Sequence, residues 1–145
     1  MSLKIICGAD HAGFSLKEIL KLKLIEMGHE IVDCGTHSGE QPVDYPDYAF
    51  KVAELLKKDE GGFGLLICGS GIGISIAANR FPGIRAALCH DVTSARLARV
   101  HNDANILVLG ERLIGSCTAE ECLEVFLSTP FKGGERHQRR VEKLG

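Results

Sequence analysis

A glycine-rich segment that opens with a cysteine carries the strongest chemical signal in the sequence. Its letters, CGSGIGIS, run from Cys68 to Ser75 and follow an apolar run of strand length. Alternating glycines let backbone N–H groups face a ligand, and a helix that begins at such a turn adds the positive end of its dipole. A thiol in this position is favoured as its thiolate, the form that acts as a base or nucleophile. The segment therefore predicts an anion-binding turn beside a reactive sulfur.

Three nucleotide or phosphate chemistries can be tested against the same letters. The dinucleotide pattern G-x-G-x-x-G fails because the third glycine, Gly73, comes one residue early and Ile74 stands in its place. A Walker loop ends in Gly-Lys-Ser/Thr, and this turn has no lysine. A cysteine phosphatase needs an arginine that closes the loop, and none occurs before Arg80. A plain tight turn with a buried, unreactive Cys68 remains open on position alone.

Two further sets of polar residues could take part in catalysis or binding. Asp10 and His11 follow the first apolar run directly, and Asp10 taken alone is equally explained as a helix N-cap. His101 lies at the end of a predicted helix, where the dipole favours a protonated imidazole, although a capping or solvent-exposed role fits as well.

The C-terminal tail, from about residue 130, is locally basic. Arg136, His137, Arg139 and Arg140 follow two glycines, and Arg136 and Arg140 are one helical turn apart. Such a run is commonly a solvated face, but paired guanidinium donors also bind phosphate. The cluster is short and has no accompanying aromatic residues, which argues against nucleic-acid binding.

The elements that must position these groups alternate along the chain. Each strand-like run is followed by a helical pattern, which predicts one parallel sheet with helices on both faces. Ligands of such sheets bind beyond the carboxyl ends of the strands. That rule selects the residues just after the strands: Asp10 and His11, residues 68–73, His90 and Asp91, and Glu111 and Arg112. The predicted strands are residues 4–8, 30–34, 64–68, 84–89 and 104–109, and the predicted helices are 14–27, one beginning near Pro46, one through Ala78, 91–100 and 118–127.

Bulk properties limit the class of protein. A chain of 145 residues with a formal net charge of -2 predicts a single domain, residues 1–145, with no overall attraction to nucleic acid or membranes. No signal peptide or membrane-spanning run is visible, so we expect a cytoplasmic protein. The six cysteines lack a C-x-x-C pair, and we expect all except Cys68 to be buried core residues in a reducing compartment.

The motifs together resemble a known family. GADHAGFSLK, DYPDYA, ICGSGIGISIAANRFPGIRAALC, ARLARVHNDANILVLGERLIG and GGERHQRRVE are similar to segments of the type B ribose-5-phosphate isomerases, a family that includes galactose- and allose-6-phosphate isomerases. The similarity runs from about Lys4 to Glu142. It implies a three-layer α/β/α Rossmann-like sandwich, and a homodimer or pair of dimers with active sites between subunits.

The resemblance also implies roles for individual residues. Cys68 would be the base that moves a proton between C1 and C2, and His101 would open the furanose ring. Ile74 stands where some members carry a glutamate base, which places this chain in the thiol-using branch. Glu135 is a departure, since an arginine is expected directly after the glycines. The expected substrate-binding residues are Asp10, His11, Gly69, Ser70, Gly71, Ile72, Gly73, Asn102, Arg112, Arg136 and Arg140, with the arginines mainly at phosphate.

The implied chemistry agrees with the residues. Isomerisation removes a proton next to a carbonyl, so it needs a base and stabilisation of an oxyanion. A thiolate beside N–H donors supplies both, and we expect no metal or cofactor. Ribose 5-phosphate is the favoured substrate. Three alternatives remain open: a hexose-6-phosphate isomerase, a non-catalytic phosphosugar-binding domain, and a subunit that needs a different partner chain.

Overall fold

Five parallel strands form one sheet in the computed structural model, which describes residues 1–59 and 61–145. The order across the sheet is β2-β1-β3-β5-β4. The inner strands β1, β3 and β5 are buried along nearly their whole length, as expected of strands covered on both faces. The strand bounds are β1 (Lys4–Ala9), β2 (Glu30–Asp33), β3 (Phe63–Cys68), β4 (Ala86–Leu88) and β5 (Ile106–Gly110).

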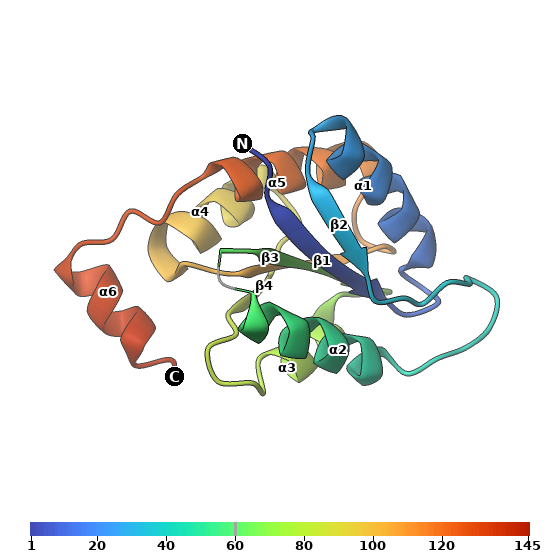
Figure 1. The fold of residues 1–145 in the computed structure, drawn as a ribbon, viewed down its shortest axis with the longest axis horizontal. Coiled ribbons are helices and arrows are strands. Elements are labelled where there is room, and N and C mark those ends of the chain that lie inside the picture. The colour runs from blue at the N-terminus through green and yellow to red at the C-terminus, as the bar shows by residue number, and fades with distance from the viewer. Residues whose placement is uncertain (60) are drawn as a thin grey trace.

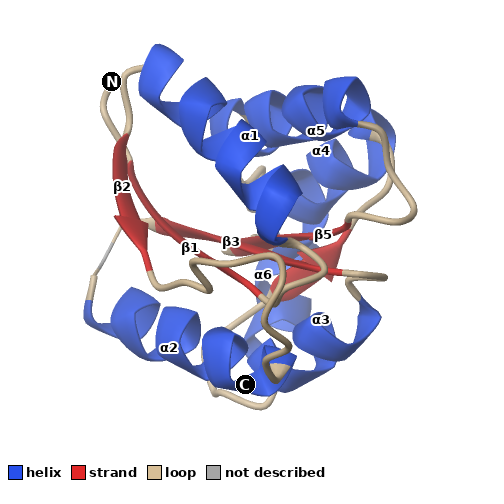
Figure 2. Cartoon of the chain, turned by 90° about the vertical axis from the view of Figure 1, so that its right-hand side faces the viewer, coloured by secondary structure: helices blue, strands red, loops and turns tan. Residues whose placement is uncertain are grey.

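Helices cover both faces of this sheet, so the predicted three-layer α/β/α sandwich is confirmed (Figures 1 and 2). One apolar core lies between the sheet and α1, α4 and α5, and a second lies between the sheet and α2 and α3. The last helix, α6, stands apart from the layers beyond α4 (Figure 1). The helix bounds are α1 (Phe14–Glu26), α2 (Tyr45–Lys58), α3 (Ile72–Ala78), α4 (Val92–Asn102), α5 (Ser116–Ser128) and α6 (Glu135–Glu142).

The edge strand β4 is shorter than the predicted 84–89. At its start the Asn105 side chain accepts from the Arg85 N–H at 2.8 Å, in place of a backbone partner on β5. The Asn79 amide binds both the N–H and the carbonyl of Ala86, the first residue of β4, at 2.8 and 2.9 Å. Because Asn79 covers backbone groups of an edge strand, it discourages pairing with another sheet.

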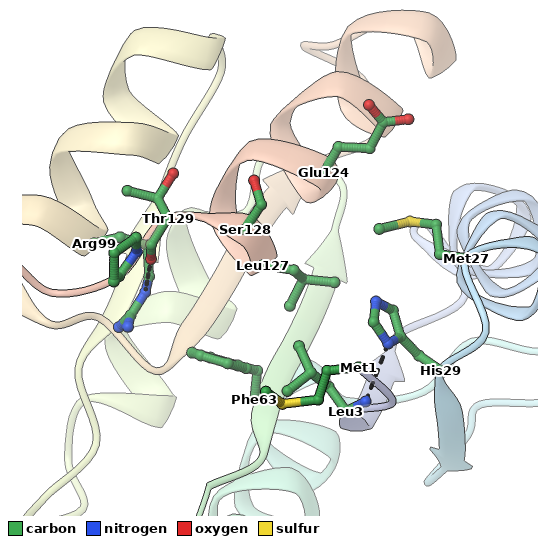
Figure 3. Close-up of a pocket in the computed structure, with 11 residues that line it drawn as sticks. Met1, Leu3, Met27, His29, Phe63, Arg99, Glu124, Leu127, Ser128 and Thr129 are labelled. Atoms are coloured by element: carbon green, nitrogen blue, oxygen red, sulfur yellow. Dashed lines mark hydrogen bonds between the residues drawn. The ribbon is translucent and has the colours of Figure 1, made fainter.

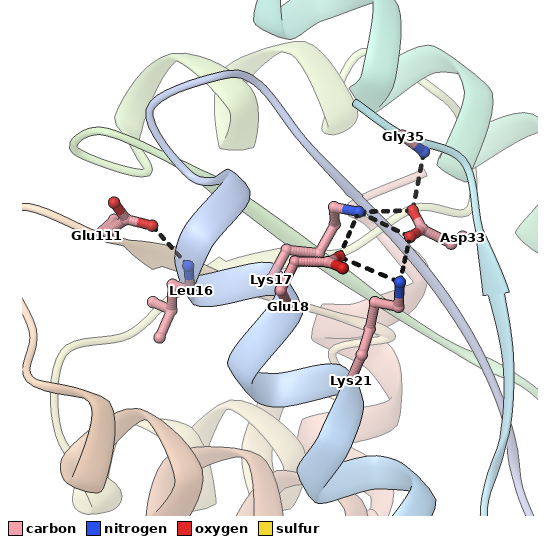
Figure 4. A network of polar contacts seen from close by, with 7 residues as sticks. All are labelled: Leu16, Lys17, Glu18, Lys21, Asp33, Gly35 and Glu111. Atoms are coloured by element: carbon pink, nitrogen blue, oxygen red, sulfur yellow. Dashed lines mark hydrogen bonds and ion pairs between the residues drawn. The ribbon is translucent and has the colours of Figure 1, made fainter. Parts of the chain in front are cut away.

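A buried ion-pair network fixes α1 against the end of β2 (Figure 4). The Lys17 side chain is fully buried, and its Nζ lies 2.7 Å from a carboxylate oxygen of Asp33. Lys21 binds the same carboxylate at 2.8 Å, and both lysines also bind Glu18. Burial alone would raise the pKa of Asp33, but hydrogen bonds from the two lysines and from the Gly35 N–H outweigh it and hold the pKa below its usual value.

Most cysteines lie in the core, as predicted. Burial raises the pKa of Cys7 to about 12 and that of Cys122 to about 11, so these thiols stay protonated and inert. Cys34 is only half-buried. For Cys117 the prediction is wrong: it is exposed, because it lies in the first turn of α5 on the solvent side.

Across the residues that the structure describes, none of the helices combines the length and apolar character needed to cross a bilayer.

Candidate active site

The turns that follow β1, β3 and β5 meet at the carboxyl edge of the sheet. Backbone bonds join two of them: the Glu111 N–H donates to the Cys68 carbonyl at 3.0 Å, and the Arg112 N–H donates to the Gly69 carbonyl at 2.9 Å. Glycine makes this proximity possible, because a Cβ on Gly110 would collide with the backbone of the turn after β3. Two of the loops that the strand-end rule selected, those after β3 and β5, are therefore in direct contact.

Cys68 ends β3 and lies in the wall of a pocket of about 480 Å³. Its residue is only 4% exposed, yet it lines this pocket rather than being sealed in the core. Gly71 adopts a left-handed φ of 77°, which turns the chain so that the Gly71 N–H donates to the Cys68 Sγ at 3.1 Å. An N–H directed at sulfur stabilises negative charge on it, as a base at this position requires.

Asp10 and His11 form the facing wall of the same pocket. The Asp10 Oδ1 accepts N–H bonds from Ala12 and Gly13 at 3.0 and 3.1 Å, so the capping role considered for it is real. The His11 Nδ1 accepts from the Val43 N–H at 3.1 Å. Because Nδ1 is an acceptor, the neutral ring carries its proton on Nε2 and can donate to a bound oxygen.

Eight of the predicted residues line this one pocket, and Gly71 supplies the N–H to the sulfur from behind it. The pocket-lining members are Asp10, His11, Cys68, Gly69, Ser70, Ile72, Gly73 and Arg112.

Sequence reasoning missed Tyr45 and Leu113, which also line the pocket. Tyr45 is the first residue of α2, and its ring lies over Gly73: a Cβ there would approach the ring to 2.6 Å. Tyr45 stands in the segment DYPDYA that carried part of the family resemblance, but no role was assigned to it.

Four predicted residues lie elsewhere in the chain. His101 and Asn102 end α4, which leads back to the amino end of β5, whereas Cys68 pairs with Gly110 at the carboxyl end of that strand. The four steps of β5 between these ends span about 13 Å. Arg136 and Arg140 belong to α6, and the His101 ring stacks on that of His137 with centroids 4.7 Å apart. A single chain thus holds its predicted site residues in two groups, one at the carboxyl ends of the strands and one at their amino ends.

The whole chain can be compared with known proteins. A profile of the Ribose/Galactose Isomerase family matches residues 5–144. This chain belongs to the ribose/galactose isomerase family. Ribose-5-phosphate isomerase B of Escherichia coli is 48% identical over 141 residues, which cover 97% of this chain and 93% of that protein. Ribose-5-phosphate isomerase B of Mycobacterium tuberculosis is 39% identical over 142 residues, covering 98% of this chain and 88% of its own length.

Solved structures agree with this family membership. A ribose 5-phosphate isomerase from Thermotoga maritima superposes with a TM-score of 0.94 at 55% identity, covering 98% of this chain and 97% of that chain. Ribose-5-phosphate isomerase B of Clostridium thermocellum gives 0.95 at 50% identity, covering 99% and 95%. The resemblance inferred from the motifs is confirmed, together with the fold that it implied.

A larger pocket, of about 520 Å³, lies at the opposite edge of this ribose/galactose isomerase fold (Figure 3). Its polar groups are already engaged: the His29 Nδ1 accepts from the Leu3 N–H at 3.1 Å, and the Arg99 Nε donates to the Thr129 carbonyl at 3.1 Å. Arg99 also packs over the Phe63 ring, 4.9 Å from its centroid. Apolar side chains supply most of the wall, and the pocket contains neither the glycine-rich turn nor a thiol.

Metal ligation finds no support in the part of the chain that the structure describes, because no three His, Cys, Asp or Glu side chains there are grouped to hold an ion. The carboxyl-edge pocket is lined by the Cys68 thiol, the His11 imidazole, the glycine-rich turn and Arg112. Groups of these kinds are suited to proton transfer and to stabilisation of an oxyanion.

Proposed function

We propose that this chain is a ribose-5-phosphate isomerase that interconverts ribose 5-phosphate and ribulose 5-phosphate. The observation that carries the proposal is the position of Cys68, in the wall of a polar pocket with the Gly71 N–H directed at its sulfur. Relatives at 39% and 48% identity, named ribose-5-phosphate isomerase B, support the choice of a pentose phosphate.

The proposed reaction begins with the open-chain aldose in the carboxyl-edge pocket. The Cys68 thiolate takes the proton from C2, the C1–C2 double bond forms, and the electron pair of the C1 carbonyl moves onto its oxygen. The glycine-rich turn, residues 69–73, would supply backbone N–H groups to the enediolate, a contribution of about 3 kcal/mol for each well-placed donor, while the Gly71 N–H serves the sulfur.

Completion of the cycle returns the same proton to the neighbouring carbon. The Cys68 thiol gives its proton to C1, while one proton passes from the C2 hydroxyl oxygen to the C1 oxygen, so the ketose contains the same atoms as the aldose. His11, with its proton on Nε2, and Asp10 line this pocket and would contact substrate oxygens. No metal or other cofactor enters this sequence.

The second group of residues completes the site from another copy of the chain in this proposal. His101 would open the furanose ring, Asn102 would bind the sugar, and Arg136 and Arg140 would bind the phosphate. A homodimer, alone or paired into a dimer of dimers, supplies both groups at one place. Two features support it: α6 projects from the sandwich (Figure 1), and Ile72 is 51% exposed beside the pocket.

The proposed organisation is one domain over residues 1–145 with α6 as its basic arm. We also propose a cytoplasmic location, supported by six free thiols, which suit a reducing compartment.

A coupled assay of the purified chain tests the function. We expect turnover of ribose 5-phosphate to exceed that of allose 6-phosphate and galactose 6-phosphate, and Cys68→Ala to abolish it while phosphosugar binding persists. Faster turnover of a hexose phosphate would favour the alternative isomerase. Phosphosugar binding with neither turnover nor exchange of the C2 proton with solvent would indicate a non-catalytic domain, and activity only after addition of a different chain would indicate an incomplete subunit.

A further inference from the structure

Glu111 is a charged residue at the carboxyl edge to which the proposed reaction gives no role. Its Oε1 accepts the Leu16 N–H at 2.7 Å, so its side chain crosses from the turn after β5 to the first turn of α1 (Figure 4). Its backbone N–H donates to the Cys68 carbonyl at 3.0 Å. One residue therefore contacts the start of α1 and the end of the strand that bears the proposed base.

The start of α1 needs such an acceptor. Its N-cap is Gly13, which has no side chain to accept the orphan N–H groups of the first turn. Asp10 takes the N–H groups of Ala12 and Gly13 just ahead of the helix, and Glu111 takes that of Leu16, the third residue of the helix. A carboxylate at this place also interacts favourably with the helix dipole.

The position of Glu111 links two walls of the pocket. Asp10 and His11, on one wall, immediately precede α1, and Arg112, on the other, immediately follows Glu111. The backbone bonds of Glu111 and Arg112 reach only the turn after β3. Within residues 1–59 and 61–145, the contact between Glu111 and Leu16 is the only side-chain hydrogen bond from the turn after β5 to α1.

We propose that Glu111 is a positioning residue for the isomerisation. Its carboxylate holds the turn that carries Arg112 at a fixed place relative to Asp10 and His11, and so keeps the guanidinium aligned with a bound phosphosugar. The inference rests on the proposed function, because it assigns Arg112 to that substrate.

Steady-state kinetics with ribose 5-phosphate test this role. Glu111→Ala should lower kcat/KM about tenfold, the size expected for losing one charge-assisted hydrogen bond. Glu111→Gln keeps an oxygen acceptor and should retain most of the activity. Glu121→Ala, which removes an exposed carboxylate on α5, is the matched control and should be unaffected.

A double-mutant cycle separates positioning through Arg112 from a general structural effect. If Glu111 acts through Arg112, the double variant Glu111→Ala/Arg112→Ala should be no worse than Arg112→Ala alone. The role would be overturned if the losses of kcat/KM in the two single variants multiply in the double variant. It would also be overturned if Glu111→Ala has the same kinetics as the Glu121→Ala control. If Glu111→Ala does not fold, Glu111→Asp gives the same test, because it keeps the charge but shortens the reach.

Amide hydrogen exchange gives a readout that does not depend on turnover. The Leu16 N–H should exchange faster in Glu111→Ala than in the wild type, and unchanged exchange would refute the cap. A wild-type chain without isomerase activity would refute the proposed function. If the wild type is active and Glu111→Ala has the same kcat/KM, only the role of Glu111 is refuted.

Discussion

Mixing two inactive variants provides the sharpest test of a site shared between copies. Cys68→Ala removes the proposed base at the carboxyl edge, and the double variant Arg136→Ala/Arg140→Ala removes the proposed phosphate ligands on α6. Both arginines are exposed in the chain, so their loss should leave the fold intact. Each variant alone should turn over ribose 5-phosphate at a small fraction of the wild-type rate.

The expected recovery follows from pairing statistics. Random exchange makes half of the dimers mixed, and each mixed dimer has one site with both defects and one with neither, so about a quarter of the wild-type sites return. A site contained in one chain predicts none, because every chain then carries a defect. The two groups are separated by the length of β5, about 13 Å along the strand, whereas a hydrogen bond spans about 3 Å.

The assay uses the two variants with different affinity tags, co-expressed and purified in sequence over both tags. Mixed dimers obtained in this way should have about half the wild-type activity per dimer, since one of two sites is intact. Each variant purified alone, and the two mixed immediately before the assay, are the controls for residual activity. Mixed dimers no more active than the controls, or an arginine variant with normal kinetics, would refute the shared site.

Three other perturbations separate the remaining roles. His101→Asn should reduce turnover of cyclic ribose 5-phosphate more than that of a linear analogue, and equal losses would contradict ring opening. Arg140→Ala alone should chiefly raise KM in the same assay, and an unchanged KM would place the phosphate elsewhere. Asp33→Asn should lower the free energy of unfolding at pH 7 by about 3 kcal/mol, because the buried Lys17 then keeps only its longer ion pair with Glu18. Since the folded-state pKa of Asp33 is depressed, the wild type loses this stability as pH falls below about 4, and denaturant unfolding should show a flatter acid dependence for Asp33→Asn.

The strand and helix pattern of the chain was predictable because each element has its own periodicity. The inner strands are continuous apolar runs, and the helices repeat at helical spacing. Local patterns could not show that other groups compete with the neighbouring strand for backbone hydrogen bonds. Ile84 and Arg85 have strand-like character, yet the Ile84 N–H closes a turn on the Phe81 carbonyl and the Asn105 side chain takes the Arg85 N–H.

The sequence predicted most of the residues that gather at the carboxyl-edge pocket. It did not predict that His101 lies away from them. Of the residues that the strand-end rule selected, Asp10, His11, Cys68 and Arg112 line one pocket. His90, Asp91 and Glu111 do not line it. The same rule, carried one step further, separates His101 from the pocket: a helix that follows a parallel strand must return to the amino edge before the next strand begins. Motif spacing contains no such information, because residues that serve one site in an assembly need not approach each other in one chain.

A site shared between two chains would also explain the poor burial of α6 and the exposed isoleucines of α3. Helix α6 is short and buries only Val141, and isolated helices of this length are marginal in water. Ile72 and Ile76, one turn apart on α3, are 51% and 54% exposed beside the pocket that α6 of another copy would have to reach. In a dimer, α6 of one chain would reach the pocket of the other chain and be packed there. The same association would cover the exposed isoleucines. Dilution into monomers should therefore weaken the helicity of α6 and phosphate binding together.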